Sequence, residues 1–330
     1  MAASAQLYFD GGRRPQRHVV APGHGCTFQN RVWRIRHADR IHSNPTSQMR
    51  RKVEACRPTV DLSESTSMNR IGTVESVWRY PVKSMRGEAL QEVFAGFPGV
   101  YGDRLYAFRN SKAPKGFPYL TGRELPTMLL YPPRYQNPER MTTPPNLAEA
   151  EAISPLLTPL YAGADDLALH VEAPSGDQFP IDDPKLIATL RAGISRESEL
   201  TLLQSHRAMT DCRPISLFSL QTVRQLEDEL GISLDKRRFR ANIYLHLNSG
   251  KGFDEDLLVG RTLRIGAKTT IAVMDRDPRC KMITLDPDTG EQNPKIAKHL
   301  AIAHESKAGV YGVVLIEGML RPGDEISLMD

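Results

Sequence analysis

The sequence predicts a mainly β protein with a few helices. Strand-length segments, some of them alternating, recur at short intervals through residues 70–330, and glycine- or proline-rich turns separate most of them. The same region shows no alternation of strands with long helices, no glycine-rich phosphate loop and no internal repeat. Hydrophobic residues at 40% and charged residues at 25% are ordinary values for a globular protein. We therefore expect short strands arranged as a sandwich or barrel.

The first 69 residues differ in composition from the rest of the chain. They hold eleven lysines and arginines against five acids, whereas the other 261 residues carry a formal charge of −2. Their apolar residues are scattered singly among arginine, serine, proline and histidine, without a helix or strand period, which is typical of disorder. We expect residues 1–69 to form a disordered basic extension. An arginine-rich, acid-poor segment also resembles an organelle transit peptide, so residues 1–67 leave a mitochondrial location open.

Composition also excludes several kinds of partner. A nucleic-acid-binding body normally carries the basic excess itself, and residues 70–330 do not, so we expect no nucleic-acid partner. No apolar run is long enough to cross a bilayer and no secretory signal is visible, which predicts a cytoplasmic protein without a transmembrane segment. The four cysteines (Cys26, Cys56, Cys212 and Cys280) are too few for a disulfide framework.

Order is expected to begin at Ile71–Tyr80, where apolar and polar residues alternate as in a half-buried strand. Residues 136–160, with several prolines and acids, are expected to form a surface excursion. Pro184–Ala192 is predicted to be a short helix, because proline opens it and Gly193 follows its end. Further strands are expected at Ala89–Phe94, Leu105–Phe108, Thr127–Tyr131 and Leu167–Val171.

The clearest helix of the chain is Leu220–Leu230. Ser219 is a natural N-cap, leucine and valine repeat at helical spacing, and Gly231 ends the helix. A second helix is expected at Pro294–Ala303. Strands are expected at Leu200–Leu203, Ile243–Leu247, Leu257–Val259, Leu263–Ile265, Ile271–Met274, Met282–Leu285 and Tyr311–Ile316.

Cys280 stands in a basic stretch, with Arg276, Arg279 and Lys281 close to it in sequence. A thiol becomes a nucleophile or a metal ligand only as the thiolate, and nearby cations favour that form. Asp286–Gly290, which reads Asp-Pro-Asp-Thr-Gly, predicts a tight turn after it. A buried cysteine that packs as a small hydrophobic residue is the common alternative. The three cations favour the reactive thiol.

Cations also occur at the ends of predicted strands, where Lys83 and Ser84, Arg104, and Arg240 and Asn242 lie. Singly, such residues are usually solvated surface groups. Together with a thiol they could surround an anionic ligand, because arginine and lysine form charge-assisted hydrogen bonds to phosphate. No C-x-x-C or H-E-x-x-H motif predicts a metal cluster, although a thiolate among these cations could ligate a soft or redox metal.

The chain carries a series of short motifs whose order along the sequence resembles that of the MOSC family, named for the molybdenum cofactor sulfurase C-terminal domain. Within it the chain is most similar to the two-domain proteins that include the mitochondrial amidoxime-reducing components. The resemblance runs from about Ile71 to Leu328. It rests on Tyr80–Ser84, Gly102–Arg104, Asp211–Pro214, Phe239–Asn242, Arg279–Cys280, Thr284–Gly290 and Tyr311.

The resemblance implies a MOSC N-terminal β-barrel domain over residues 70–195 and a MOSC β-barrel domain over residues 196–330. A molybdenum cofactor of the molybdopterin type would bind between them, with Cys280 as the molybdenum ligand and the catalytic residue. No pyridoxal phosphate or iron–sulfur site is expected in the chain. The implied cofactor contacts are Lys83, Ser84, Arg104, Asp211, Cys212, Arg213, Pro214, Arg240, Asn242, Pro278, Arg279 and Tyr311.

The implied activity is reduction of N-hydroxylated small molecules such as amidoximes and hydroxylamines. Electrons would come from a separate donor, which would be a reductase, a cytochrome b5-like protein or a ferredoxin-like protein. A carrier of the cofactor, or of a persulfide on Cys280, without turnover is the alternative, and a binding protein that has lost the metal is a third. The chain departs from its relatives at Cys212, Arg213 and Ala241. Arg213 could narrow the substrate pocket or add an anion contact, and Cys212 could be a redox-sensitive thiol.

Overall fold

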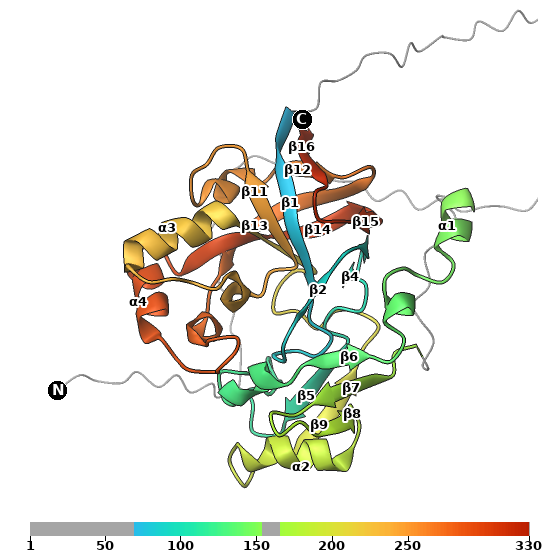
Figure 1. Ribbon diagram of the computed structural model, residues 1–330, viewed down its shortest axis with the longest axis vertical. Coiled ribbons are helices and arrows are strands. Elements are labelled where there is room, and N and C mark those ends of the chain that lie inside the picture. Colours follow the sequence, from blue (N-terminus) through green and yellow to red (C-terminus); the bar gives the residue numbers. More distant parts are fainter. Residues whose placement is uncertain (1–68, 154–165, 330) are drawn as a thin grey trace, which may run out of the picture. The chain divides into compact units, whose positions relative to one another are not determined.

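Seven strands of the described chain close into a barrel (Figure 1). The computed structural model describes residues 69–153 and 166–329, all within one compact unit, Ser63–Asp330. The barrel strands are β1 (Asn69–Arg79), β10 (Ile215–Ser219), β11 (Ile243–Leu247), β12 (Thr262–Ile265), β13 (Thr269–Pro278), β14 (Lys307–Ile316) and β16 (Glu325–Met329). They are paired in the order β11-β10-β14-β13-β12-β16-β1, and β1 pairs back with β11. The β10–β11 pair is parallel and the others are antiparallel.

β1 lies far from the other barrel strands in sequence, yet it closes the barrel. Val77 is opposite Ile243 of β11, and Thr73 is opposite Glu325 of β16. Gly72 allows β1 to approach β11 closely, because a Cβ atom there would lie 2.4 Å from the backbone oxygen of His246. The strand expected at Ile71–Tyr80 is confirmed.

The segments between β1 and β10 form smaller sheets. Their elements, with one late strand, are β2 (Glu88–Leu90), β3 (Val93–Gly96), β4 (Gly99–Val100), β5 (Tyr106–Asn110), β6 (Pro133–Tyr135), β7 (Leu169–Glu172), β8 (Gln178–Pro180), β9 (Leu200–Gln204), β15 (Gly318–Leu320), α1 (Leu147–Ile153) and α2 (Pro184–Ala192). The sheets have the orders β15-β3-β4, β5-β9 and β6-β7-β8, and β2 pairs with β1. The predicted helix α2 is confirmed, with Asp183 as its N-cap.

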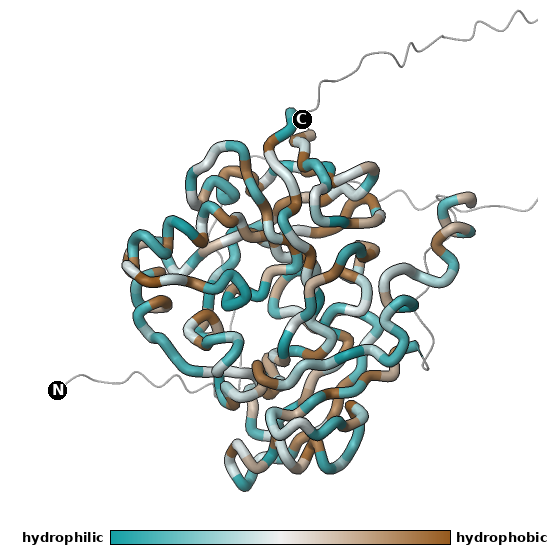
Figure 2. Tube along the Cα trace, viewed as in Figure 1, coloured by the Kyte–Doolittle hydropathy of each residue, from teal (hydrophilic) through white to brown (hydrophobic). Residues whose placement is uncertain are grey.

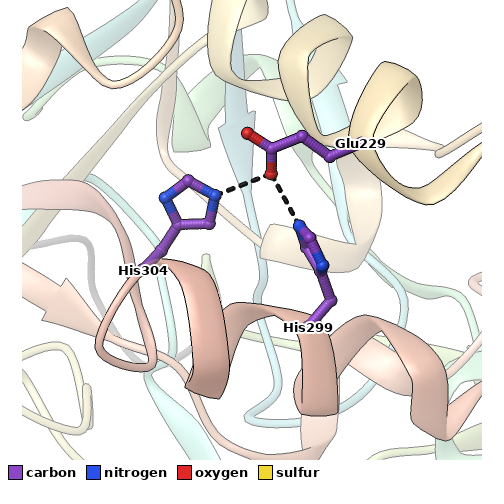
Figure 3. Close-up of side chains that lie close together, drawn as sticks. All are labelled: Glu229, His299 and His304. Atoms are coloured by element: carbon purple, nitrogen blue, oxygen red, sulfur yellow. Dashed lines mark hydrogen bonds and ion pairs between the residues drawn. The ribbon is translucent and has the colours of Figure 1, made fainter.

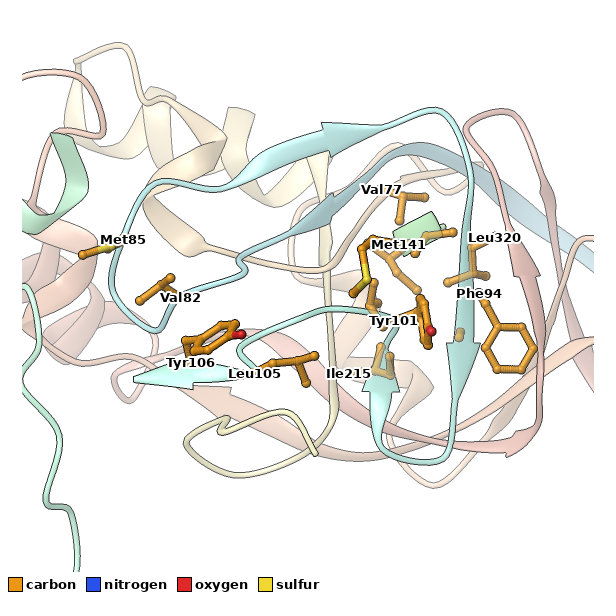
Figure 4. Packing of buried hydrophobic residues seen from close by; sticks show 14 of the residues in the cluster. Val77, Val82, Met85, Phe94, Tyr101, Leu105, Tyr106, Met141, Ile215 and Leu320 are labelled. Atoms are coloured by element: carbon orange, nitrogen blue, oxygen red, sulfur yellow. The ribbon is translucent and has the colours of Figure 1, made fainter. Parts of the chain in front are cut away.

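One hydrophobic cluster extends from the barrel into the smaller sheets (Figure 4). Val77 of β1 and Ile215 of β10 belong to it together with Phe94 of β3 and Tyr106 of β5, and none of the four is more than 4% exposed. Burying such side chains is the dominant favourable term in folding. The barrel and the smaller sheets are therefore held together by a shared core.

Helices α3 (Leu220–Leu230) and α4 (Pro294–Ala303) pack on a second hydrophobic cluster that includes Phe218, Leu226 and Leu300. Ser219 Oγ accepts a hydrogen bond from the backbone of Thr222 at 3.1 Å and caps α3. Gly231 ends α3 with a φ of 65°, in the left-handed region. Both helices lie where the sequence predicts them.

Three expected strands are instead 3₁₀ helices. The segments predicted as strands are Thr127–Tyr131, Leu257–Val259 and Met282–Leu285. The helices found there are η1 (Pro126–Leu130), η4 (Asp254–Leu258) and η5 (Lys281–Thr284). A short apolar run has no period that separates a strand from a single helical turn. Two other 3₁₀ helices are η2 (Pro138–Met141) and η3 (Lys236–Phe239).

Hydrophobic and hydrophilic residues are interleaved along the chain trace (Figure 2). In the part of the chain that the structure describes, no helix is long and apolar enough to cross a membrane. Of the expected disordered extension, residues 1–68 lie outside the described residues, and Asn69 begins β1. The domain boundary after residue 195 and the cytoplasmic location stay predictions.

Candidate functional site

One pocket brings together most of the residues that the sequence singles out. Its lining comes from the turns after β1 and before β5, the segment before β10, the loop from η3 to β11, the end of β13, and β14. Cys212 and Pro214 are not among its lining residues, and Cys212 is an exposed free thiol. The predicted residues that line it are Lys83, Ser84, Arg104, Asp211, Arg213, Arg240, Asn242, Pro278, Arg279, Cys280 and Tyr311.

Cys280 lies between β13 and η5, where it is the N-cap residue of η5 and has an extended backbone. Its thiol is free and the residue is half-buried. Of the three cations near it in sequence, only Arg279 lines the pocket. Arg276 is held in ion pairs with two acids, at 2.7 and 3.2 Å, and Lys281 is exposed. Of the three cations, Arg276 and Lys281 therefore do not contribute to the lining of the pocket.

Two half-buried arginines from different segments meet at Tyr80. The guanidinium carbons of Arg240 and Arg104 lie 4.3 and 4.6 Å from the centroid of its ring, and Arg104 Nη2 donates to the backbone oxygen of Arg240 at 3.1 Å. Burial lowers the pKa of Arg240 to about 10, so its side chain remains charged at neutral pH. Arg104 also forms an ion pair with the buried Asp103 at 2.5 Å, so its charge is partly compensated, and Arg240 supplies the greater attraction for an anion.

The backbone of the pocket is strained at three lining residues. Ser84, Arg104 and Arg240 have φ values of 67°, 48° and 52°, in the left-handed region that side chains other than glycine rarely adopt. Such conformations cost roughly 1–3 kcal/mol each and cluster at functional sites. The chain therefore tolerates local strain in order to place these three residues.

Lys83 is buried, and its ammonium group is already partnered. It forms an ion pair with Asp211, donates to the backbone oxygen of Met209 at 2.8 Å, and lies 4.9 Å from the centroid of the Tyr119 ring. Burial lowers the pKa of Lys83, and the charge of Asp211 opposes this shift. The positive charge that Lys83 brings to the pocket is therefore shared with an acid.

Two other arginines have buried nitrogens with unused hydrogen-bonding capacity. Arg238 donates to the backbone oxygen of Thr284 at 3.1 Å and to Asp286 at 2.7 Å, but its Nε has no hydrogen-bond partner among the described residues. Arg279 donates to two backbone oxygens, at 2.7 and 2.8 Å. Its Nη2 forms an ion pair with Asp277 at 2.8 Å without meeting hydrogen-bond geometry. Leaving a buried donor such as Arg238 Nε unpaired costs about 1–3 kcal/mol.

Asp277 is the buried acid of the pocket, with 2% of its surface exposed. Burial raises its pKa to about 6, although the charge of Arg279 and a hydrogen bond with Tyr311 oppose the shift. Burial also raises the pKa of Tyr311, and the charge of Asp277 adds to this effect. At neutral pH the Tyr311 hydroxyl is therefore a hydrogen-bond donor, and Asp277 is mostly ionised.

Several lining residues were not predicted from the sequence. Arg238 belongs to a basic run over residues 236–240, but nothing in the sequence shows which members of that run face a pocket. With the unpredicted residues included, seven lysine or arginine side chains line the pocket against two aspartates. The unpredicted residues are Thr121, Arg123, Thr210, Ser216, Arg238, Phe239, Asp277, Met282 and Ile283.

The arrangement combines one thiol with seven lysine or arginine side chains, five of which are ion-paired with acids. Arg213 contributes least, because it is partly exposed and is paired with Asp275 at 2.9 Å. The buried cations and the unpaired donors fit an anionic ligand such as a phosphate ester. Cys280 adds a donor atom suited to a soft or redox metal. The pocket can therefore hold an anion and a metal side by side.

Comparison with known proteins shows two family models that match the chain. Residues 71–181 match the model of the MOSC N-terminal beta barrel domain, and residues 204–327 match that of the MOSC domain. Mitochondrial amidoxime reducing component 2 from Bos taurus is 24% identical over 241 residues, which cover 68% of this chain and 69% of that protein.

Two solved structures also resemble the chain. YiiM from Geobacillus stearothermophilus is 21% identical, with a TM-score of 0.29, over 36% of this chain and 55% of that one. The YUAD protein from Bacillus subtilis is 13% identical, with a TM-score of 0.39, over 79% of this chain and 97% of that one. The assignment rests on the two domain matches, which together span most of the described chain: the protein belongs to the MOSC family, with a MOSC N-terminal β-barrel domain followed by a MOSC domain.

Proposed function

We propose that the pocket binds a molybdenum cofactor of the molybdopterin type and that the protein reduces N-hydroxylated small molecules with it. The observation that carries the proposal is that the Cys280 thiol lines one pocket together with several arginines from distant parts of the chain. Molybdopterin is phosphorylated and anionic, and molybdenum accepts a thiolate ligand. The similarity to an amidoxime reducing component favours this chemistry over other uses of the same cofactor.

In this proposal the residues of the pocket divide into two groups. Cys280 would hold the metal, while Arg238, Arg240 and Arg279 would bind the phosphate with their charge-assisted donors. Arg104 supports Arg240 through the shared contact with Tyr80 and would add to the positive potential. The remaining predicted contacts, including Ser84, stay proposals of the same kind.

When bound, the cofactor supplies the redox chemistry that no side chain provides. The overall change, amidoxime plus two electrons and two protons to amidine plus water, also needs a source of protons. Asp277, with a pKa of about 6, is the lining residue best suited to exchange a proton near neutral pH, and Tyr311 orients its carboxyl group. Electrons would come from a separate reductase, a cytochrome b5-like protein or a ferredoxin-like protein.

The test is reduction of benzamidoxime by the full chain, produced in a host that makes the cofactor and assayed with a chemical electron donor. We expect turnover by the wild-type protein and none by Cys280→Ser. Cys212→Ser is the matched control, because Cys212 is free but lies outside the pocket lining, and it should retain activity. Bound molybdenum without any turnover would instead favour the carrier function.

A further inference from the structure

Glu229, His299 and His304 form a cluster at the ends of two helices, apart from the pocket (Figure 3). The Nε2 atoms of His299 and His304 lie 2.6 and 2.7 Å from the same oxygen of Glu229. All three donor atoms lie within 4.8 Å of one another. None of the three residues lines the pocket that contains Cys280.

Neighbouring side chains orient the cluster. Gln225 donates to the second oxygen of Glu229 at 2.8 Å, which leaves the first oxygen directed at the two histidines. The ring of His304 stacks on Phe253, with centroids 3.9 Å apart and planes inclined by 12°. Supporting contacts of this kind fix the direction of ligands in known metal sites. The side chains are only partly exposed, at 26% for His299 and 14% for His304.

We infer that this cluster is a binding site for a divalent transition-metal ion, with Zn²⁺ as the physiologically abundant candidate. Two imidazole nitrogens and one carboxylate oxygen are a donor set that Zn²⁺ takes in proteins, with a fourth position left for water. A tetrahedral ion with bonds of about 2.0–2.1 Å needs donor atoms roughly 3.3 Å apart. The two histidine–glutamate distances must therefore lengthen by only about 0.6–0.7 Å, which small side-chain rotations provide.

The electrostatics of the two helices favour a cation at this place. Glu229 lies in the last turn of α3, His304 is the C-cap residue of α4, and His299 lies just before the last turn of α4. Neither helix has a basic residue in its last turn, so the partial negative charges of both C-termini remain uncompensated there. Burial disfavours the ionised form of Glu229, but hydrogen bonds from His299, Gln225 and His304 outweigh it and lower its pKa to about 2.

Such an ion would link α3 to α4. The two helices pack on one hydrophobic cluster, which also contains Ile283 of η5. A metal bridge adds coordination bonds between elements that already share side-chain packing and the contacts of Glu229 with the two histidines, so binding should stabilise the folded chain by mass action. Because the site is separate from the pocket, metal loading here is independent of the proposed molybdenum chemistry.

Equilibrium dialysis of the full chain against buffered Zn²⁺, after removal of metal with a chelator, tests the inference. We expect His299→Ala, His304→Ala and Glu229→Gln each to bind one Zn²⁺ ion per chain fewer than the wild type. Thiols and histidines elsewhere contribute equally to all these proteins and cancel in the difference. His246→Ala is the matched control, because His246 is exposed on β11 and should leave the count unchanged.

Equal Zn²⁺ counts in the wild type and the three variants would overturn the inference. Thermal unfolding in chelator shows that each variant is folded, and the near-isosteric Glu229→Gln is the one least able to disturb packing. Zn²⁺ should also raise the melting temperature of the wild type more than that of Glu229→Gln. An equal rise in both proteins would count against the site, whether or not the pocket binds a molybdenum cofactor.

Discussion

Asn242 shows that a single residue of the pocket can serve the fold as well as the site. Its Oδ1 accepts from the backbone and hydroxyl of Ser216 at 3.2 and 3.1 Å, and its Nδ2 donates to the backbone oxygen of Trp78 at 3.3 Å. These contacts link the segments of β1, β10 and β11 at one end of the barrel. With 1% of its surface exposed, Asn242 is mainly a structural residue, whatever it also offers to a ligand.

We expect Asn242→Ala to lower the free energy of unfolding by about 1–3 kcal/mol, because it leaves buried partners without hydrogen bonds. Denaturant unfolding measures the change. Asn248→Ala is the control, since Asn248 makes one exposed hydrogen bond to Arg70 and should change stability by less than about 0.5 kcal/mol. Equal effects of the two substitutions would contradict the structural role.

Asp277 makes anion binding in the pocket depend on pH. Its folded pKa, about 6, is higher than the ordinary 3.8, so the carboxyl is ionised at pH 7 and mostly protonated at pH 5. Protonation removes a negative charge beside Arg279. Sulfate keeps its charge over this range, and we expect the cofactor-free protein to bind it roughly tenfold more tightly at pH 5 than at pH 7.

Two variants test whether Asp277 causes the pH dependence of sulfate binding. Asp277→Asn should bind sulfate at pH 7 about as well as the wild type does at pH 5, and should lose most of the pH dependence. Asp275→Asn, which removes an exposed acid paired with Arg213, should keep the wild-type pH dependence. Calorimetric titration that finds the same pH dependence in Asp277→Asn and the wild type would refute the assignment to Asp277.

Neighbours in sequence are a poor guide to neighbours in the pocket. Lys281 is adjacent to Cys280 in sequence, as Arg279 is, and Arg276 is only four residues away, yet neither Lys281 nor Arg276 lines the pocket. Arg104 and Arg240 lie far from Cys280 in sequence and line the same pocket. Motifs order such residues along the chain, but only the barrel topology brings them together.

Elements with strong local signals are predictable from the sequence. Ser219 and Gly231 bound α3 where the capping rules place its ends. β10 was missed, because all five of its residues are buried and a strand covered on both faces shows no alternation. The apolar segments that form the 3₁₀ helices η1, η4 and η5 predict strands instead, since a few apolar residues do not define a period.

β1 depends on a close approach to β11 at Gly72. We expect Gly72→Ala to destabilise the protein by about 1–3 kcal/mol, because the added Cβ would overlap the backbone oxygen of His246. Gly116→Ala is the control, since a Cβ at Gly116 would meet nothing within 4 Å. Thermal unfolding that ranks the two substitutions equally would show that β1 is not fixed against β11 at this position.

For the whole molecule, we expect that the chain can be shortened from its N-terminus as far as the start of β1 without loss of stability. Deletion of residues 1–67 should leave the melting temperature unchanged, because the barrel strands begin at Asn69. Deletion of residues 1–79 removes β1 and leaves β11 and β16 without the strand that joins them, so we expect no cooperative unfolding. A marked fall in melting temperature for the shorter deletion would refute the expected disorder of residues 1–67.

For the whole molecule, the motifs and their order along the sequence predict the fold class and many of the residues that line the pocket. They do not predict the closure of the barrel by β1, because pairing between strands so distant in sequence leaves no local signal. The unused donor of Arg238 is equally invisible in sequence, since it depends on how the other nitrogens of that guanidinium are partnered.

The central claim, that Cys280 holds molybdenum in the pocket, is tested most directly by the molybdenum content of three proteins made in the same cofactor-producing host. We expect close to one molybdenum atom per chain in the wild type and in Cys212→Ala, and little or none in Cys280→Ala. Equal molybdenum contents in Cys280→Ala and the wild type, or none in any of the three, would contradict it.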